Sequence, residues 1–316
     1  MTSSPRSAPG RLAAAAALAS LLAGCSSSDD SAGGDDGSTK IGFVNGAGTV
    51  FHTCLQKAME QSAKSQGAHL VVANSSQNPV TELSNIEDLI ARDVDELIVQ
   101  TVDVDTLDVD VAKARAAGIP IFLTSVNVED LSGVLGAVVV DLGRLGALDA
   151  GWVEQDAAGQ DVKVGVIAGA PGAASDLMVA GFEQALPANA KMVSELPGMF
   201  DPAKARESAQ DMIEAHPDLD YAFVANEEMA LGARQVFDAA GAHVKIVTVN
   251  GTDEGLKAVK DGRFSATVAN SASVLGQLAV RNSLGLMAGS AVEKVTSAPI
   301  LLVTRENVDE APAYCS

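Results

Sequence analysis

The chain has 316 residues, a hydrophobic content of 47%, an aromatic content of 3% and a formal net charge of −20. This hydrophobic content excludes a disordered chain, and the few aromatic residues predict a core built mainly from aliphatic side chains. The 21 Lys and Arg residues are scattered along the sequence, against 41 Asp and Glu. An acidic chain without a basic cluster is not expected to bind nucleic acid.

The N-terminal residues have the features of an export signal. Two arginines accompany the apolar run LAAAAALASLLAG, which is too short to span a bilayer comfortably. The run leads into Leu22-Ala23-Gly24-Cys25. This tetrad resembles the lipobox of bacterial lipoproteins, in which the cysteine is lipidated and the chain is cut just before it. We expect a signal peptide over 1–24, lipidation at Cys25 and a polar tether over 25–39. The alternative is an ordinary secretory signal with a chance cysteine.

From Lys40 onward, short apolar runs alternate with segments of helical period. The first set predicts strands at 41–45, 69–73, 96–100, 120–123 and 137–140, and helices at 51–67, 80–93 and 105–118. Because the runs are apolar throughout, both faces of each strand are expected to be buried, which is typical of parallel sheets. Gly67 and Gly118 are expected to end their helices in the left-handed conformation.

The same rhythm restarts after Asp141. Strands are predicted at 163–168, 191–196, 221–225, 245–250 and 265–269, and helices at 173–186, 202–216 and 227–241. Asp201-Pro202 is typical of a helix start, and Gly241 of a helix end. Two such sets predict an α/β protein with two doubly wound parallel-sheet lobes. Ligands of these sheets bind in the loops after the strands, and two lobes place those loops across a cleft.

The motifs of nucleotide, metal and catalytic sites fail at specific positions. Phe51 stands where the third glycine of a dinucleotide-binding fingerprint is needed. The acidic run DVDTLDVD lacks the glycine and glutamate of a calcium loop, and its Asp105 is more simply a helix cap. No His is spaced for a metal, and no nucleophile–base set can be nominated. We therefore expect no catalytic residues, no metal and no cofactor.

Polar uncharged residues cluster instead at the predicted strand ends. Such groups both donate and accept hydrogen bonds and suit neutral ligands, although a single Asn at these places can simply form a turn. His52 lies in a loop after a strand, and Asp103 lies at the cleft end of its strand. The candidate amides and hydroxyls are Asn45, Thr49, Ser125, Asn127, Asn226, Asn250 and Asn270.

Two cysteines remain beyond Cys25, namely Cys54 and Cys315. An even pair outside the cytoplasm favours a disulfide. The sequence does not give the distance between them, so one buried and one exposed thiol stays the alternative.

Four longer segments resemble the ribose-binding-protein family of type I periplasmic solute-binding proteins. They are SSQNPVTELSNIEDLIARDVDELIV, AGIPIF, AHPDLDYAFVANEEMALGA and VNGTDEGLKAVKDGRFSATVA, and the resemblance runs from about Lys40 to Thr304. It implies two α/β lobes joined by a three-crossover hinge, with a small ligand bound between them. It also implies delivery of the ligand to an ABC importer and in some members to chemoreceptors.

The resemblance also implies roles for individual residues. Asn45 takes the place of the first polar contact, and Phe51 and His52 take the place of an aromatic group that faces the sugar. Phe200 before Asp201 and the amide of Asn226 match the family pattern. Glu227 and Glu228 are expected to stabilise the start of their helix, so that Glu227→Gln costs little stability.

Several positions depart from the ribose-binding pattern. Ser125 and Val126 replace an Asp-Arg pair, and Asp176 and Met178 replace arginines on the helix after Gly172. Asn250 replaces an acid, and Asn270 replaces a glutamine. Because charged contacts give strong directional binding, their loss predicts a neutral sugar-like or polyol-like ligand rather than ribose.

These observations predict a monomeric, lipid-anchored solute-binding protein on the outer face of the cell membrane. Its partners are a small neutral solute and an ABC permease with its ATPase; it contacts the membrane only through its anchor. The expected lobes are 40–141 plus 271–297 and 142–270 plus 298–316. The alternative function is a sensory module that docks a membrane receptor or kinase. An enzyme on the same scaffold is disfavoured, because no nucleophile–base set is present.

Overall fold

A computed structural model describes residues 38–126, 128 and 130–315. Lipidation at Cys25, the signal peptide, most of the tether and the candidate Asn127 lie outside the described residues. Within the described residues, no helix is both long and apolar enough to cross a membrane.

The first lobe is built on a parallel sheet of six strands in the order β11-β5-β4-β3-β1-β2. Strands β1, β3, β4 and β5 are buried along almost their whole length, as continuous apolar runs predict. The strands are β1 (Lys40–Asn45), β2 (His69–Asn74), β3 (Glu96–Val99), β4 (Ile121–Ser125), β5 (Gly136–Val139) and β11 (Val295–Ser297). The helices are α1 (Val50–Ser65), α2 (Pro79–Ala91), α3 (Leu107–Ala116) and α9 (Ala272–Met287).

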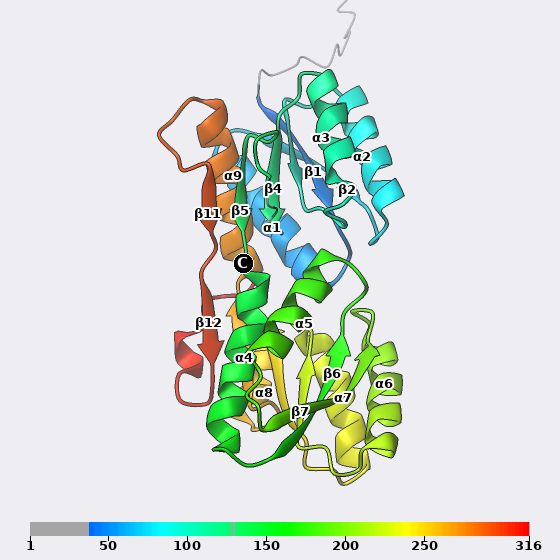
Figure 1. The fold of residues 1–316 in the computed structure, drawn as a ribbon. Coiled ribbons are helices and arrows are strands. Elements are labelled where there is room, and N and C mark those ends of the chain that lie inside the picture. Colours follow the sequence, from blue (N-terminus) through cyan, green and yellow to red (C-terminus); the bar gives the residue numbers. More distant parts are fainter. Residues whose placement is uncertain (1–37, 127, 129, 316) are drawn as a thin grey trace, which may run out of the picture. The chain divides into compact units, whose positions relative to one another are not determined.

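The second lobe repeats this plan with the order β12-β10-β9-β8-β6-β7, in which only the β10–β12 pair is antiparallel. Helix α4 packs on α5, and α6 packs on α7 (Figure 1). The strands are β6 (Val162–Ala168), β7 (Ala190–Pro197), β8 (Tyr221–Val224), β9 (Lys245–Asn250), β10 (Ala266–Asn270) and β12 (Ile300–Val303). The helices are α4 (Leu142–Ala157), α5 (Ala173–Ala185), α6 (Pro202–Ala215), α7 (Glu227–Ala239), α8 (Asp253–Lys260) and the short 3₁₀ helix η1 (Val308–Glu310).

The helix signals of the sequence are confirmed at most positions. Asp201 caps α6 by accepting from the backbone N–H groups of Ala203 and Lys204, with Pro202 at the first helical position. Gly67, Gly118 and Gly241 have φ values of 71°, 76° and 69°. The cap expected at Asp105 is wrong: α3 begins at Leu107, after Thr106.

The chain passes between the two sheets at three places, which confirms the predicted fold class. These are the β5–α4 connection near Asp141, the β10–α9 connection at Asn270–Ser271, and Ala298–Pro299 between β11 and β12.

The last residues return to the first lobe, and the disulfide that the sequence favoured between Cys54 and Cys315 is confirmed. Residues 298–316 were assigned to the second lobe, but Cys315 forms a disulfide with Cys54 of α1, with a Cα–Cα distance of 5.0 Å. The carbonyl oxygens of Ala313 and Tyr314 accept from Ser271 Oγ (2.6 Å) and Ser273 N (3.0 Å) at the start of α9. The C-terminal residues are therefore fastened to the first lobe.

Candidate ligand-binding cleft

A cavity lies where the carboxyl ends of the strands of both lobes meet. The first lobe contributes Gly46, Ala47, Thr49, Phe51, His52, Gln77, Gln100, Thr101, Val102, Ser125, Val126 and Val140. The second lobe contributes Leu142, Leu145, Ala170, Pro171, Gly172, Ala174, Met178, Phe200, Ala225, Asn226, Val249, Asn250 and Asn270. Loops at the carboxyl ends of parallel strands are where α/β sheets bind ligands. We refer to this cavity as the cleft.

The described lining of the cleft carries no Asp, Glu, Lys or Arg. Its histidine, His52, is neutral near pH 7, because burial lowers the pKa of the imidazole to about 4. Thr49 Oγ1 lies 2.8 Å from His52 Nδ1 and fixes the ring. An uncharged lining suits a neutral solute, because a buried ion without a partner carries a large desolvation cost.

Three amides supply polar contacts from the second lobe and the hinge. Asn226 lines the cleft and caps α7, because its Oδ1 accepts from Met229 N at 2.8 Å. Asn270 Oδ1 is buried and has no hydrogen-bond partner among the described residues. Asn250 makes no side-chain hydrogen bond in the described residues and has a φ of 137°. Groups left unpaired at a cavity are suited to pair with a ligand.

Backbone strain also concentrates at the cleft. Gln77, Ser125, Phe200 and Asn250 line it and have positive φ values of 59°, 73°, 52° and 137°. Residues other than glycine avoid this region, because the Cβ clashes with the backbone. Such strain persists only where the surrounding structure enforces it, and it is common at binding sites.

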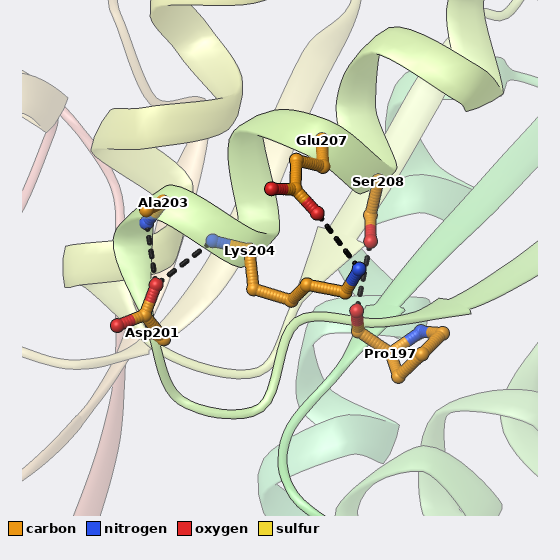
Figure 2. Close-up of polar contacts among 6 residues, drawn as sticks. All are labelled: Pro197, Asp201, Ala203, Lys204, Glu207 and Ser208. Atoms are coloured by element: carbon orange, nitrogen blue, oxygen red, sulfur yellow. Dashed lines mark hydrogen bonds and ion pairs between the residues drawn. The ribbon is translucent and has the colours of Figure 1, made fainter.

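Phe200 is placed by the loop that leads into α6. Its ring lies directly over Gly169, where an added Cβ would come within 2.1 Å of a ring carbon, so only glycine fits there. Asp201 caps the helix that follows, and Ser208 Oγ donates to the carbonyl oxygen of Pro197 at 2.8 Å, which ties the loop to α6 (Figure 2).

The structure brings eight of the predicted residues together at the cleft, namely Thr49, Phe51, His52, Ser125, Phe200, Asn226, Asn250 and Asn270. Three other predicted residues do not line it. Asn45 is buried at the end of β1, and its Nδ2 donates to the carbonyl oxygen of His52 at 3.2 Å, so it supports the loop from behind. Asp103 accepts from Asp105 N at 2.9 Å and forms a turn. Asp176 is exposed on α5.

Polar lining residues that the sequence analysis missed are Gln77, Gln100 and Thr101. Gln100 Oε1 accepts from Gly46 N, and its Nε2 donates to Ser125 Oγ, both at 3.4 Å. Gln100 could have been found from the sequence, because it is the polar residue directly after the apolar run of β3. Thr101 directly follows it.

The prediction that Glu227 only stabilises the N-terminus of α7 by its charge is incomplete. Its side chain is buried and accepts from Gly251 N (2.9 Å), Thr252 N (2.7 Å) and Thr267 Oγ1 (2.6 Å). Burial raises the pKa of this carboxyl, and the hydrogen bonds from Thr252, Thr267 and Gly251 oppose the rise. Glu227 therefore holds the loop after Asn250 from behind the cleft.

Glu228 has a different environment. Burial raises the pKa of its carboxyl, and the backbone N–H of Val50 at the start of α1 opposes the rise. Helix α1 has no acidic residue in its first turn and no side-chain cap. The Glu228 carboxyl of the second lobe therefore lies near the N-terminus of a first-lobe helix that has no acidic residue of its own there.

No group of three or more His, Cys, Asp and Glu side chains that could hold a metal is found among the described residues. The residues that line the cleft can supply hydrogen bonds, the aromatic faces of Phe51 and Phe200, and apolar surface.

Comparison with known proteins decides the family. The profile described as the periplasmic binding protein domain matches residues 41–291. The chain belongs to this family. It is 29% identical over 257 residues to the ribose import binding protein of Bacillus subtilis, covering 81% of this chain and 84% of that protein. It is 32% identical over 262 residues to the ribose import binding protein of Salmonella typhimurium, covering 81% and 87%.

The solved structures agree with this assignment. An ABC transporter solute-binding protein from Mycobacterium smegmatis with bound glycerol is 28% identical and superposes with a TM-score of 0.81, covering 88% of this chain and 99% of that chain. The periplasmic binding protein family binds solutes for ABC transport, and these relatives are binding proteins rather than enzymes.

Proposed function

We propose that this protein is a lipid-anchored, extracytoplasmic binding protein that delivers a neutral sugar-like or polyol-like solute to an ABC importer. The observation that carries the proposal is the uncharged cleft, in which Asn226, Asn250 and Asn270 present amide groups at the ends of β8, β9 and β10. Amides pair well with hydroxyl and carbonyl groups. The relatives support it, since two of them are ribose import binding proteins and one structure holds glycerol.

Within this proposal the lining residues have distinct roles. Asn226 Nδ2 donates to a ligand oxygen, and Asn250 and Asn270 both donate and accept. Phe51 and Phe200 supply apolar faces for the ring of a sugar. His52, being neutral, accepts or donates through its free ring nitrogen, according to its tautomer.

Ligand binding then closes the two lobes about the passages near Asp141, Asn270 and Ala298. Small-angle scattering tests this, because the radius of gyration is expected to fall when the solute is added. An unchanged radius with a tightly bound solute would contradict closure.

The ligand class is tested by a thermal-shift screen over sugars, polyols, nucleosides and small amides, followed by calorimetry. Asn250→Gly is the sharpest variant, because glycine accepts a φ of 137° while the amide is removed. We expect affinity to fall at least about tenfold with stability retained. Asp176→Ala is the matched control, since Asp176 is exposed and outside the cleft. An unchanged affinity in Asn250→Gly would contradict the assignment.

The anchor is tested separately by expression in a bacterial host that processes lipoproteins. Wild type is expected to incorporate radiolabelled palmitate and to sediment with membranes. Cys25→Ser is expected to do neither. Incorporation of label into Cys25→Ser would contradict lipidation at this cysteine.

A further inference from the structure

The cleft has one wall without side-chain polar atoms. Leu142 and Leu145 of α4 and Ala174 and Met178 of α5 line it, and we call these four residues the α4–α5 wall. Leu142, Leu145 and Met178 expose 7%, 1% and 5% of their surface. The polar side chains of the lining lie instead at strand ends or in the segments that directly follow them, including Gln100, Asn226 and Asn250.

Leu145 and Met178 stand inside α4 and α5, where the backbone N–H and C=O groups are paired within the helices and add no polar contact. Leu142 and Ala174 stand in the first turns of these helices, where backbone N–H groups have no partner within the helix. The two helices also touch through their backbones. A Cβ added at Gly146 would lie 2.0 Å from the carbonyl oxygen of Met178, and one added at Gly181 would lie 2.0 Å from the carbonyl oxygen of Gly143. Helices packed this closely have little room to rotate and to expose other side chains, so the wall keeps its apolar character when the cleft is filled.

A hydroxyl group pressed against the side chains of Leu145 and Met178 would lose its hydrogen bonds to water and find no nitrogen or oxygen partner there. A methyl group at the same place would leave water and gain close packing. The solute therefore gains affinity if it presents alkyl surface here, and hydroxyl or carbonyl groups to the amides at the strand ends.

Resting on the proposed function, we propose that the solute is a neutral sugar, polyol or related amide that carries a methyl or other short alkyl substituent. This substituent packs on the α4–α5 wall, while the polar part of the solute pairs with Asn226, Asn250 and Asn270. Deoxy sugars and O-methylated polyols belong to this chemical class.

The test uses pairs of solutes that differ at one position. Suitable pairs are D-fucose and D-galactose, L-rhamnose and L-mannose, and mono-O-methyl-myo-inositol and myo-inositol, each measured by calorimetry. In the pairs that bind, the alkylated member is expected to bind roughly tenfold more tightly, as is usual for one methyl group in an apolar pocket.

Two variants assign the preference to the α4–α5 wall. Ala174→Ser adds one hydroxyl group to a half-buried position, and Met178→Gln keeps the length of the side chain but adds an amide. Both are expected to lower or reverse the preference for the alkylated member. Asp176→Ser, on the same helix but exposed and outside the cleft, is expected to leave it unchanged. Thermal unfolding identifies any variant that fails to fold, and Ala174→Ser keeps the test valid if Met178→Gln does.

The outcomes separate the two proposals. A hydroxylated member that binds as tightly as its alkylated counterpart, with affinity that Asn250→Gly reduces, would refute the alkyl substituent and leave the proposed function standing. A preference that persists in both wall variants would also refute it. Failure of all pairs and of the wider screen of neutral solutes would refute the proposed function itself.

Discussion

Two buried glutamates, one in each lobe, hold cleft loops from behind. Glu82 of α2 accepts from Thr101 Oγ1 (2.7 Å) and Val102 N (2.8 Å), in the loop after β3. Glu227 of α7 accepts from three donors that fix the loop after β9 and the strand beside it. In both lobes, a glutamate carboxyl outside the cleft therefore fixes a loop next to the cleft-lining residues.

The two glutamates differ in the carboxyl nearest to them. Glu82 lies near Asp110, and burial raises the pKa of Glu82 to about 7 and that of Asp110 to about 6. In the part of the chain that the structure describes, Asp149 has no hydrogen-bond partner on either oxygen, and burial followed by the nearby Glu227 raises its pKa well above the ordinary value. The first lobe thus places two buried carboxyls near each other and gives Glu82 two donors, whereas the second gives three donors to Glu227 and none of those described to Asp149.

The largest effect is expected from Glu227→Ala, because it leaves three buried donors without an acceptor. We expect the free energy of unfolding to fall by roughly 3 to 5 kcal/mol, measured by urea denaturation. This replaces the smaller loss that the sequence suggested for Glu227→Gln, whose amide would direct N–H groups at N–H donors. Glu228→Ala is the control, with a smaller loss. Equal losses in the two variants would show that the three hydrogen bonds accepted by Glu227 do not make it more important for stability than Glu228.

Glu82→Ala is expected to have the second-largest effect. It removes the acceptor of Thr101 and Val102 but also separates Asp110 from a second carboxyl, so the two consequences partly offset each other. We expect a loss of roughly 1 to 3 kcal/mol in the same urea experiment. A loss larger than that of Glu227→Ala would reverse the order proposed for the two lobes.

Asp149→Asn is expected to stabilise the protein at pH 8 by about 1 kcal/mol or more, since the neutral amide avoids a buried charge without donors. The sign depends on pH. The folded-state pKa of Asp149 lies above its ordinary value of 3.8. The contribution of Asp149 to the stability of the wild type is therefore most favourable below pH 3.8 and is lost as the pH rises toward the folded-state pKa. The advantage of Asn should therefore shrink toward pH 4, and thermal melts across this range measure it. An advantage that is independent of pH would contradict a titrating carboxyl.

The smallest effect is expected on the pH slope of the first lobe. The pKa of Glu82 rises from 4.5 to about 7 and that of Asp110 from 3.8 to about 6, so their contribution to stability is complete below about pH 4 and is lost as pH rises to about 7. Asp110→Asn should flatten this slope by about 1 kcal/mol or less, measured by melts at pH 5 and pH 8. A steeper slope in the variant would contradict a raised pKa for Asp110.

Much of the fold followed from the sequence alone. Continuous apolar runs can be buried on both faces only in a parallel sheet covered by helices, and the two sets of runs became the two sheets. Asn226, Asn250 and Asn270 could be found because each ends or directly follows a strand, where the backbone must turn toward the cleft. The expectation of a neutral ligand came from the uncharged polar residues at most of these strand ends, although Asp103 and Asp176 were also predicted to meet the ligand and do not line the cleft.

Only the tertiary structure decided which polar side chains face the cleft and which stand behind it. The donors of Glu227 lie 24, 25 and 40 residues further along the chain, so no local pattern could reveal them. Asn45, Asp103 and Asp176 stand at suitable places in the sequence, but their side chains are used behind the loop, in a turn or at the surface. The Cys54–Cys315 bond spans 261 residues, and it required the C-terminal residues to return to the first lobe. A sequence determines where strands end, whereas the direction of each side chain there depends on loop conformation and on distant partners that only the packed lobes supply.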